Sequence, residues 1–186
     1  MNKQRKIVVA VTGASGSVYA LRLIEKLLEL ADTEVAVVVS ETGKLVAKHE
    51  LGSDILLQQK VTYFDVNSYY APFASGSSDY DTLIVAPCSV GTLGRIAHGT
   101  ADNLIARTAD VMMKERRRLI LLVRETPFSL IHIENMRLIS LAGGIIMPAS
   151  PSFYHNPTSL EEVIDSVADR MLDVAQLKSS IKRWNP

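Results

Sequence analysis

The feature of this sequence that most constrains its fold is a regular alternation of short apolar runs with longer segments of helical spacing. The runs have the length and composition of strands buried on both faces, and they lie at 6–11, 34–40, 81–86, 118–123 and 143–148. Helical periodicity fills the intervals, at 16–30, 42–51, 90–113 with a break near Gly99, 129–142 and 159–177. Residues 61–65 are a candidate for a short sixth strand. This order predicts an α/β fold, a three-layer sandwich built around a doubly wound parallel sheet.

The size and charge of the chain limit its domain number and the partners that it could bind. With 186 residues, of which 47% are hydrophobic, the chain suits a single domain over residues 1–186, with 178–186 as a C-terminal tail. Twenty basic and twenty acidic residues cancel, so we expect no nucleic-acid partner. The single Cys88 excludes an internal disulfide, and the sequence shows neither a leader segment nor an apolar span of about 18 residues. These features predict a soluble cytoplasmic protein without a membrane partner.

Small, hydroxyl-bearing or charged residues follow each predicted strand. In chain order these segments are "TGASGS", Ser40–Glu41, "PCSVGT", Arg124–Glu125 and "PASPSFYH". Ligands of open α/β sheets bind outside the carboxyl ends of the strands, which all lie at one edge. The topology therefore predicts a ligand site at that edge.

The first of these turns, "TGASGS" at 12–17, has the composition of an anion-binding turn. Gly13 and Gly16 permit a close backbone approach, and a helix starting near Gly16 directs amide N–H groups and its positive dipole end at a ligand. The spacing matches neither the P-loop nor G-x-G-x-x-G. It is similar to the turn of short-chain dehydrogenases, but no tyrosine has a lysine four places on, which disfavours that activity. The alternative is a tight turn without a ligand.

The segment 86–107, "APCSVGTLGRIAHGTADNLIAR", adds candidate ligand contacts after the third long strand. Ser89 and Thr92 present hydroxyls and helix-start amides, and Asn103 and Arg107 are four residues apart on one helical face. The alternative is a helix N-cap at Ser89 and a solvated arginine at 107. Four histidines, at 49, 98, 132 and 155, lack metal-ligand spacing, so we expect no metal site.

Two other features point toward subunit contacts. The loop 67–80 is rich in Tyr, Ser and Gly, which favours a lid or a contact with a neighbouring subunit over an ordinary crossover. Lys114 in "KERRR" precedes a strand and so lies near the amino edge of the sheet, away from the predicted site. If Lys114 binds substrate, it does so in a neighbour's pocket; the alternative is a basic helix end that faces water.

Several separated motifs together give the chain a family resemblance. "TGASGS", "ASGSS", the run from "APCSVGT" to "RETPFSLIHIENM" and "IIMPASPSFYHNPTSLEEVID" resemble the UbiX/Pad-type flavin prenyltransferases over nearly the whole length. The resemblance implies a flavodoxin-like subunit, a dodecamer with active sites between subunits, and no metal. It also implies that a dimethylallyl group passes from dimethylallyl monophosphate to N5 and C6 of reduced FMN. The prenylated FMN would serve a UbiD-type decarboxylase, as in ubiquinone biosynthesis or aromatic-acid breakdown.

Carried over by motif, the resemblance also implies site residues. The contacts to FMN would be made by residues of the first turn, the next two strand ends and one helix, namely Gly13, Ala14, Ser15, Ser40, Ser89, Thr92 and Arg107. The donor would be held by Ser75, Lys114, Arg124, Glu125, Tyr154 and Arg170. Catalytic roles would fall on Ser15, Glu50, Lys114, Arg124 and Glu125. Cationic side chains would stabilise the leaving phosphate, Glu125 would move a proton at that phosphate, and Ser15 with Glu50 would handle protons at the flavin. The chain has no Asp-Asp-x-x-Asp motif for Mg²⁺.

Two alternatives remain open from the sequence. "ADNL" is similar to a segment of the cysteine-type flavin decarboxylases, but the Pro-Ala-Ser-Ala-Asn-Thr stretch of those enzymes is absent, and no Met-Asn dipeptide, their substrate clamp, occurs after the initiator Met1. The second alternative is a non-catalytic FMN carrier subunit of a decarboxylase. A carrier would only need to hold FMN, so it would not need a second phosphate site formed by Lys114, Arg124, Glu125 and Arg170.

Overall fold

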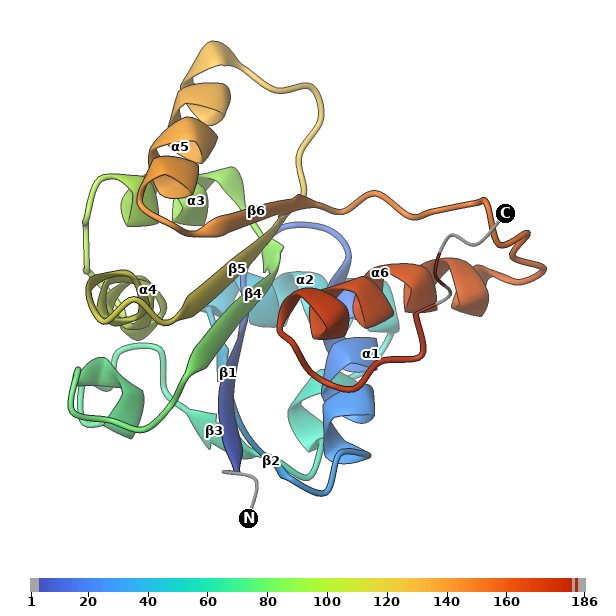
Figure 1. Cartoon of the computed structure of the whole chain (residues 1–186), viewed down its shortest axis with the longest axis horizontal. Helices are drawn as coiled ribbons and strands as arrows, with labels where there is room; N and C mark the ends of the chain where they lie inside the picture. Colours follow the sequence, from blue (N-terminus) through green and yellow to red (C-terminus); the bar gives the residue numbers. More distant parts are fainter. Residues whose placement is uncertain (1–3, 182, 184–186) are drawn as a thin grey trace.

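The computed structural model describes residues 4–181 and 183, and its centre is a six-stranded sheet in which every neighbouring pair is parallel (Figure 1). The strand order is β3-β2-β1-β4-β5-β6. The bounds are β1 (Arg5–Val11), β2 (Thr33–Val39), β3 (Thr62–Phe64), β4 (Thr82–Cys88), β5 (Arg118–Val123) and β6 (Ile145–Pro148). All five predicted strands are confirmed, and β3 is the predicted short sixth strand.

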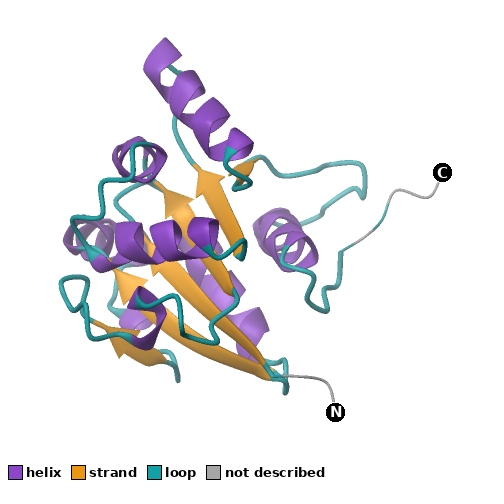
Figure 2. Cartoon of the chain, turned by 60° about the vertical axis from the view of Figure 1, so that its left-hand side comes forward, coloured by secondary structure: helices purple, strands orange, loops and turns teal. Residues whose placement is uncertain are grey.

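Helices cover both faces of the sheet (Figure 2). They are α1 (Ser17–Leu28), α2 (Glu41–Leu51), α3 (Val90–Ala97), α4 (Leu104–Lys114), α5 (Leu130–Leu141) and α6 (Leu160–Val174). The core on one face contains buried residues of α1 and α6, and the core on the other contains those of α3 and α4. Each strand supplies both cores, because alternate side chains point to opposite faces: Val9 belongs to the first core and Val8 to the second. The three-layer α/β fold is confirmed.

The helix boundaries also follow the prediction closely. The expected break near Gly99 separates α3 from α4, and Gly99 takes the left-handed φ of 67° that ends a helix. The last helix is shorter than the predicted 159–177 because Gln176, with φ 57°, leaves the helical conformation. Of the predicted tail, residues 178–181 and 183 are described, and Trp184, which we consider a candidate for packing on a neighbouring site, lies outside the described residues.

The crossover from β3 to β4 is more ordered than its composition suggests. It contains a short 3₁₀ turn, Pro72–Ala74, whose Phe73 is fully buried edge-on between Phe64 and Tyr80, with ring centroids 4.9 and 5.1 Å away. This part behaves as an ordinary packed crossover. Tyr70 at its tip is fully exposed, so a subunit contact there stays a prediction.

The strand order reverses between β1 and β4, since β2 and β3 lie on one side of β1 while β4 to β6 lie on the other. Such a switch point opens a crevice at the carboxyl ends of the two central strands. Here Thr12 links these two strand ends: its Oγ1 donates to Pro87 O over 2.8 Å and accepts from Ser89 N over 2.8 Å.

In the described part of the chain, none of the helices combines the length and hydrophobicity that a bilayer crossing requires.

Candidate functional site

The turn after β1 lies directly against the start of α2. A Cβ atom added to Gly13 would come 2.7 Å from the Cβ of Thr42, closer than real side chains approach. Gly13 is therefore required for packing between the turn and α2, whereas the sequence suggested approach to a ligand as its reason. Within the described residues, the N–H groups of Gly13 and Ser15 have no hydrogen-bond acceptor, so the turn still offers two donors.

The N-terminus of α1 is occupied by a carboxylate of the chain itself. Glu50, at the far end of α2, accepts hydrogen bonds from Gly16 N at 3.0 and 3.1 Å and from Ser17 N at 2.8 Å, and it also bonds the Ser15 hydroxyl. Partial burial would raise the pKa of Glu50, but these hydrogen bonds outweigh it and hold the pKa below its usual value. In this structure the amides of Gly16 and Ser17 are thus bonded to a carboxylate of the same chain. The roles of the turn, Ser15 and Glu50 toward a ligand stay predictions.

Two further helices begin at the same edge with serine caps. Ser40 accepts from Gly43 N over 3.0 Å at the start of α2. Ser89 accepts from Thr92 N over 3.3 Å at the start of α3, and the two hydroxyls lie 3.1 Å apart. The N-cap interpretation of Ser89 is thus confirmed. The next amides on each helix, those of residues 41, 42, 90 and 91, lack an acceptor among the described residues. Free first-turn amides beside hydroxyls suit a phosphate or a polar ring edge.

Arg124 and Glu125 follow β5 at this edge. The N–H of Arg124 donates to Cys88 O over 3.2 Å, which fixes the residue beside the end of β4. Its side chain is exposed and forms no ion pair with any described residue. Glu125 Oε1 accepts from Thr126 N over 2.9 Å. This edge therefore carries a cation that is available to an anionic ligand.

Cys88 itself is not available for chemistry. The thiol is fully buried, and burial raises the pKa of Cys88 to about 12. A neutral, inaccessible thiol is a poor nucleophile. Cys88 acts as a small core residue at the end of β4.

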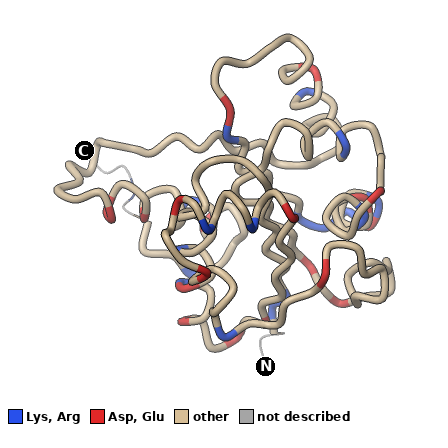
Figure 3. Tube along the Cα trace, turned by 180° about the vertical axis from the view of Figure 1, so that it is seen from behind, with Lys and Arg blue, Asp and Glu red and all other residues tan. Residues whose placement is uncertain are grey.

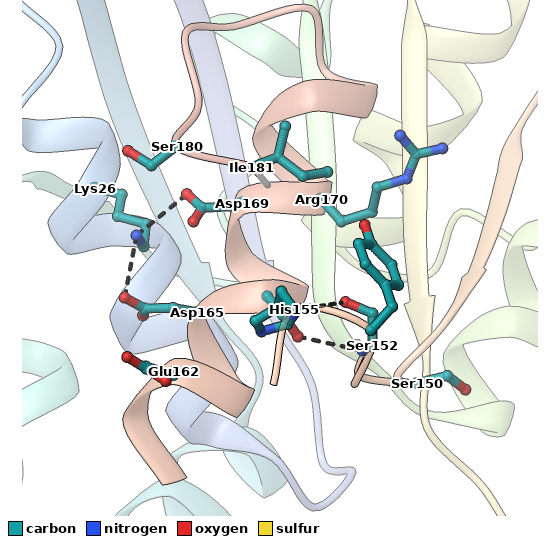
Figure 4. Close-up of a pocket in the computed structure, with 12 residues that line it drawn as sticks. Lys26, Ser150, Ser152, His155, Glu162, Asp165, Asp169, Arg170, Ser180 and Ile181 are labelled. Carbon is teal, nitrogen blue, oxygen red and sulfur yellow. Dashed lines mark hydrogen bonds and ion pairs between the residues drawn. The ribbon is translucent and has the colours of Figure 1, made fainter. Parts of the chain in front are cut away.

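A cavity of about 570 Å³ lies between the segment after β6 and helix α6 (Figure 4). Two predicted donor-binding residues, Tyr154 and Arg170, share its wall. The other lining residues are Lys26, Ser150, Ser152, His155, Glu162, Asp165, Ser166, Asp169, Ser180 and Ile181. Arg170 pairs with Asp173, at 2.5 Å, and its side chain is 55% exposed.

The acidic part of this cavity was not predicted from the sequence. Lys26 of α1 lies between Asp165 and Asp169 of α6, at 3.3 and 3.1 Å, and Arg22 contacts Asp165 at 2.8 Å. Burial would raise the pKa of Asp165, but the bond from Arg22 and the charge of Lys26 lower it overall. The four-residue spacing of Asp165 and Asp169 indicates that both lie on one face of a helix. The sequence does not indicate that this face packs against Lys26 of α1.

Three predicted residues lie elsewhere, on α4 and the 74–77 segment; we call Ser75, Arg107 and Lys114 the α4 cluster. Arg107 donates to Ala74 O over 3.0 Å and pairs with Asp110 at 2.7 Å. It is engaged there rather than with Ser89 or Thr92, because Asn103 caps α4 and Arg107 comes one turn later, facing the loop. Asn103 and Arg107 thus have different partners within the chain, and their contact with a ligand stays a prediction.

Lys114 and Ser75 complete the α4 cluster. Lys114 pairs with Glu115 and lies against the backbone at Gly76, and the Ser75 hydroxyl is 2.9 Å from that of Ser77. Lys114 ends α4 just before β5, at the amino edge of the sheet as predicted. Its role in a neighbour's pocket stays a prediction. Among the residues from 4 to 181 and 183, no three His, Cys, Asp or Glu side chains group as metal ligands. Basic and acidic residues are interspersed over the trace in Figure 3.

Comparison with known proteins agrees with this architecture. The Flavoprotein family model matches residues 1–185. The flavin prenyltransferase UbiX of Methanocaldococcus jannaschii is 43% identical over 96% of this chain and 98% of its own length. The probable UbiX-like flavin prenyltransferase of Bacillus subtilis is 44% identical over 97% of this chain and 89% of its own.

Solved structures give the same result. AnUbiX in complex with FMN and dimethylallyl pyrophosphate is 40% identical, with a TM-score of 0.92 over 99% of both chains. The dodecameric FMN-dependent UbiX-like decarboxylase of Escherichia coli O157:H7 is 35% identical, with a TM-score of 0.90 over 97% of this chain and 100% of its own. The cysteine decarboxylase TvaF is 16% identical with a TM-score of 0.64 and shares the fold alone. Sequence and structure together therefore show that the chain belongs to the flavoprotein family, among the UbiX-type flavin prenyltransferases.

Proposed function

We propose that the protein joins a dimethylallyl group, taken from dimethylallyl monophosphate, to N5 and C6 of reduced FMN. The prenylated FMN then serves a UbiD-type decarboxylase. The observation that carries this proposal is the similarity, over 99% of both chains, to AnUbiX in complex with FMN and dimethylallyl pyrophosphate. The donors and cations at the carboxyl edge supply the chemistry that such ligands need.

The switch-point crevice fits FMN by its donor set. Free N–H groups of Gly13 and Ser15 and of the first turns of α2 and α3 face the same edge. The hydroxyls of Ser40, Ser89 and Thr92 lie beside them. These residues, with Ala14, would hold FMN through its phosphate and polar ring edge. Reduced FMN, when bound, supplies the two nucleophilic atoms.

The cavity beside α6 fits the phosphate end of the donor. When the C–O bond of the donor breaks, its electron pair leaves with the phosphate, and Arg170, Arg124 and the Tyr154 hydroxyl can stabilise that charge. Hydrogen bonds to charged groups contribute about 1.5 to 3 kcal/mol each. These side chains take the place of a metal ion, so the reaction is metal-independent in this proposal.

The cations around this cavity are already engaged by carboxylates of the same chain. Lys26 and Arg22 pair with Asp165, Lys26 also pairs with Asp169, and Arg170 pairs with Asp173. A phosphate dianion placed here therefore meets cations that are already paired. Lys114 and Ser75 of a neighbouring subunit would supply further donors, and the complete site would then lie between subunits of a homo-oligomer. The dodecameric E. coli O157:H7 relative supports such an assembly.

Proton transfer falls to two carboxylates at the same edge. Glu50 bonds the Ser15 hydroxyl and has a lowered pKa, so it stays ionised and orients that hydroxyl toward the flavin. Glu125 is bonded only by its neighbouring amide among the described residues, which leaves its second oxygen for the phosphate. In this proposal Ser15 and Glu50 handle protons at FMN, and Glu125 handles one at the phosphate.

The experiment is a metal-free incubation of the purified protein with reduced FMN and dimethylallyl monophosphate. The flavin is then analysed by mass and absorbance. We expect a flavin carrying one added five-carbon unit, and Glu125→Gln should slow its formation by about tenfold or more while FMN remains bound. Recovery of unmodified flavin from the wild-type protein would overturn the proposal.

A further inference from the structure

The loop that carries Ser75 is held by an arginine outside the proposed flavin and donor ligands. Arg117 follows α4, and its two terminal nitrogens donate to carbonyl groups of this loop, Gly76 O over 2.7 Å and Tyr80 O over 3.1 Å. Both bonds are partly buried, and they join positions 41 and 37 residues apart in the chain. Arg117 therefore fastens the loop to the end of α4.

The backbone at Arg117 is fixed by the way in which α4 ends. Arg116 takes a left-handed φ of 56°. Its N–H donates back to Met113 O over 3.2 Å, and the N–H of Arg117 donates to Met112 O over 2.8 Å. This is the Schellman pattern, which closes a helix and sets the direction of the chain that leaves it. Since Met112 is fully buried, the guanidinium of Arg117 extends from a backbone that is anchored in the core.

The loop and the end of α4 approach each other most closely at Gly76. A Cβ atom added to Gly76 would overlap the side chains of Lys114 and Glu115, which pair with each other. The Lys114 ammonium thus lies against the loop backbone one residue after Ser75. These two residues of the α4 cluster are the proposed donor ligands, and they lie on two segments that Arg117 joins.

Ser75 lies between two buried aromatic anchors of the loop, Phe73 and Tyr80. Its own bonds are local, since its N–H donates three residues back along the loop and its hydroxyl lies 2.9 Å from that of residue 77. The carbonyl groups before and after Ser75 are both held from the α4 side, the first by Arg107 over 3.0 Å and the second by Arg117 over 2.7 Å. Arg107 is already a proposed FMN ligand, so Arg117 is the contact that can be changed without altering a ligand-binding residue.

We propose that Arg117 is a positioning residue for the donor: it holds Ser75 beside Lys114, so that the two contact the phosphate of dimethylallyl monophosphate as one unit. This inference rests on the proposed function and adds to it a residue that touches neither ligand. A guanidinium suits the task, because its planar fork reaches two carbonyl groups at once, whereas a lysine ammonium is a point charge on a flexible stem.

Donor kinetics give the first test. Arg117→Ala should raise the KM for dimethylallyl monophosphate by about fivefold or more, while the dissociation constant of FMN stays close to that of wild type. A smaller rise in the donor KM, or an equal loss of FMN affinity, would overturn the proposal. The matched control is Arg116→Asn, which changes the exposed neighbouring arginine to a residue that tolerates a left-handed backbone, and it should keep wild-type kinetics.

A double variant tests whether Arg117 acts through Ser75. In a Ser75→Ala protein the loop no longer carries the hydroxyl that Arg117 positions, so Arg117→Ala should raise the donor KM by a smaller factor there than in wild type. Factors that multiply in full would show that Arg117 acts through general stability, and would contradict the proposal. If Arg117→Ala does not fold, Arg117→Lys serves in the same measurements, because it keeps the charge and loses the two-carbonyl fork.

Hydrogen exchange separates failure of this inference from failure of the proposed function, because it needs no substrate. Amides of residues 75–80 should exchange about fivefold faster or more in Arg117→Ala than in wild type, and at the wild-type rate in Arg116→Asn. A wild-type protein that leaves FMN unmodified would refute the proposed function. A wild-type protein that prenylates FMN, together with unchanged exchange in Arg117→Ala, would refute the role of Arg117 alone.

Discussion

At the scale of single residues, Glu50 changes the interpretation of the glycine-containing turn after β1. The turn at 12–17 has the composition of a phosphate-binding turn, yet a carboxylate from the end of α2 takes two of its amides. Nothing local in the sequence indicates this, because residues 16 and 50 meet only when α1 and α2 pack side by side. By contrast, the caps at Ser40, Ser89 and Ser159 follow from residue type alone, since each side chain bonds an amide three residues on.

The carboxylate of Glu50 should contribute pH-dependent stability. Its pKa in the folded protein lies below the usual 4.5, so its contribution is complete above that value and is lost as the pH falls through the lower folded pKa. We expect Glu50→Gln to lower the free energy of unfolding by about 1 kcal/mol at pH 7, a value discounted for partial exposure. Denaturant titrations from pH 7 to pH 3 should show that the difference from wild type shrinks toward the acid end.

The matched control is Glu41→Gln, a carboxylate of the same helix that pairs with Lys44 on the surface. Surface pairs contribute little, so this variant should remain close to wild type at pH 7. A Glu50→Gln difference that stays constant over the whole pH range would contradict the assigned role of the carboxylate.

At the scale of elements, the sequence is sufficient to predict the strands and helices, but not the contacts between turns and loops. The five long strands and the break between α3 and α4 are predictable because buried β-branched runs and a left-handed glycine have distinct local signatures. The 3₁₀ turn at Pro72–Ala74 is not predictable, because Phe73 is ordered by aromatic partners on β3 and before β4. The bond from Arg107 to Ala74 O is not predictable for a similar reason, because it joins α4 to a loop about 33 residues earlier in the chain.

The contact between the first turn and α2 leads to a prediction about Gly13. Gly13→Ala brings a methyl group against Thr42, so the turn or the helix must shift, which should lower the free energy of unfolding by about 1 to 3 kcal/mol. The measurement is urea denaturation of Gly13→Ala, Thr42→Gly and the double variant. Because Thr42→Gly removes the opposing atoms, the double variant should lose less stability than the two single losses added together. Strict additivity would show that the two residues do not oppose each other.

At the scale of the whole molecule, the residues of the proposed site lie in separate places on one subunit. The free amides and Arg124 lie at the carboxyl edge, and Tyr154 and Arg170 line the cavity beside α6. The α4 cluster, with Lys114 and Ser75, remains bound to its own loop elsewhere on the chain. The topology of the sheet is sufficient to predict this separation, because Lys114 comes just before a strand and Arg124 just after it.

Subunit complementation tests the central claim, that Lys114 of one chain completes the donor site of another. Lys114→Ala and Arg170→Ala should each abolish most prenylation when they are expressed alone. Co-expressed in equal amounts, they should regain about a quarter of wild-type activity, because random pairing leaves about that share of sites with both residues intact. Tyr154→Ala with Arg170→Ala is the control and should regain nothing, since both residues line one cavity of one chain. Mixed Lys114→Ala and Arg170→Ala oligomers that bind FMN but stay as inactive as the separate variants would contradict the account.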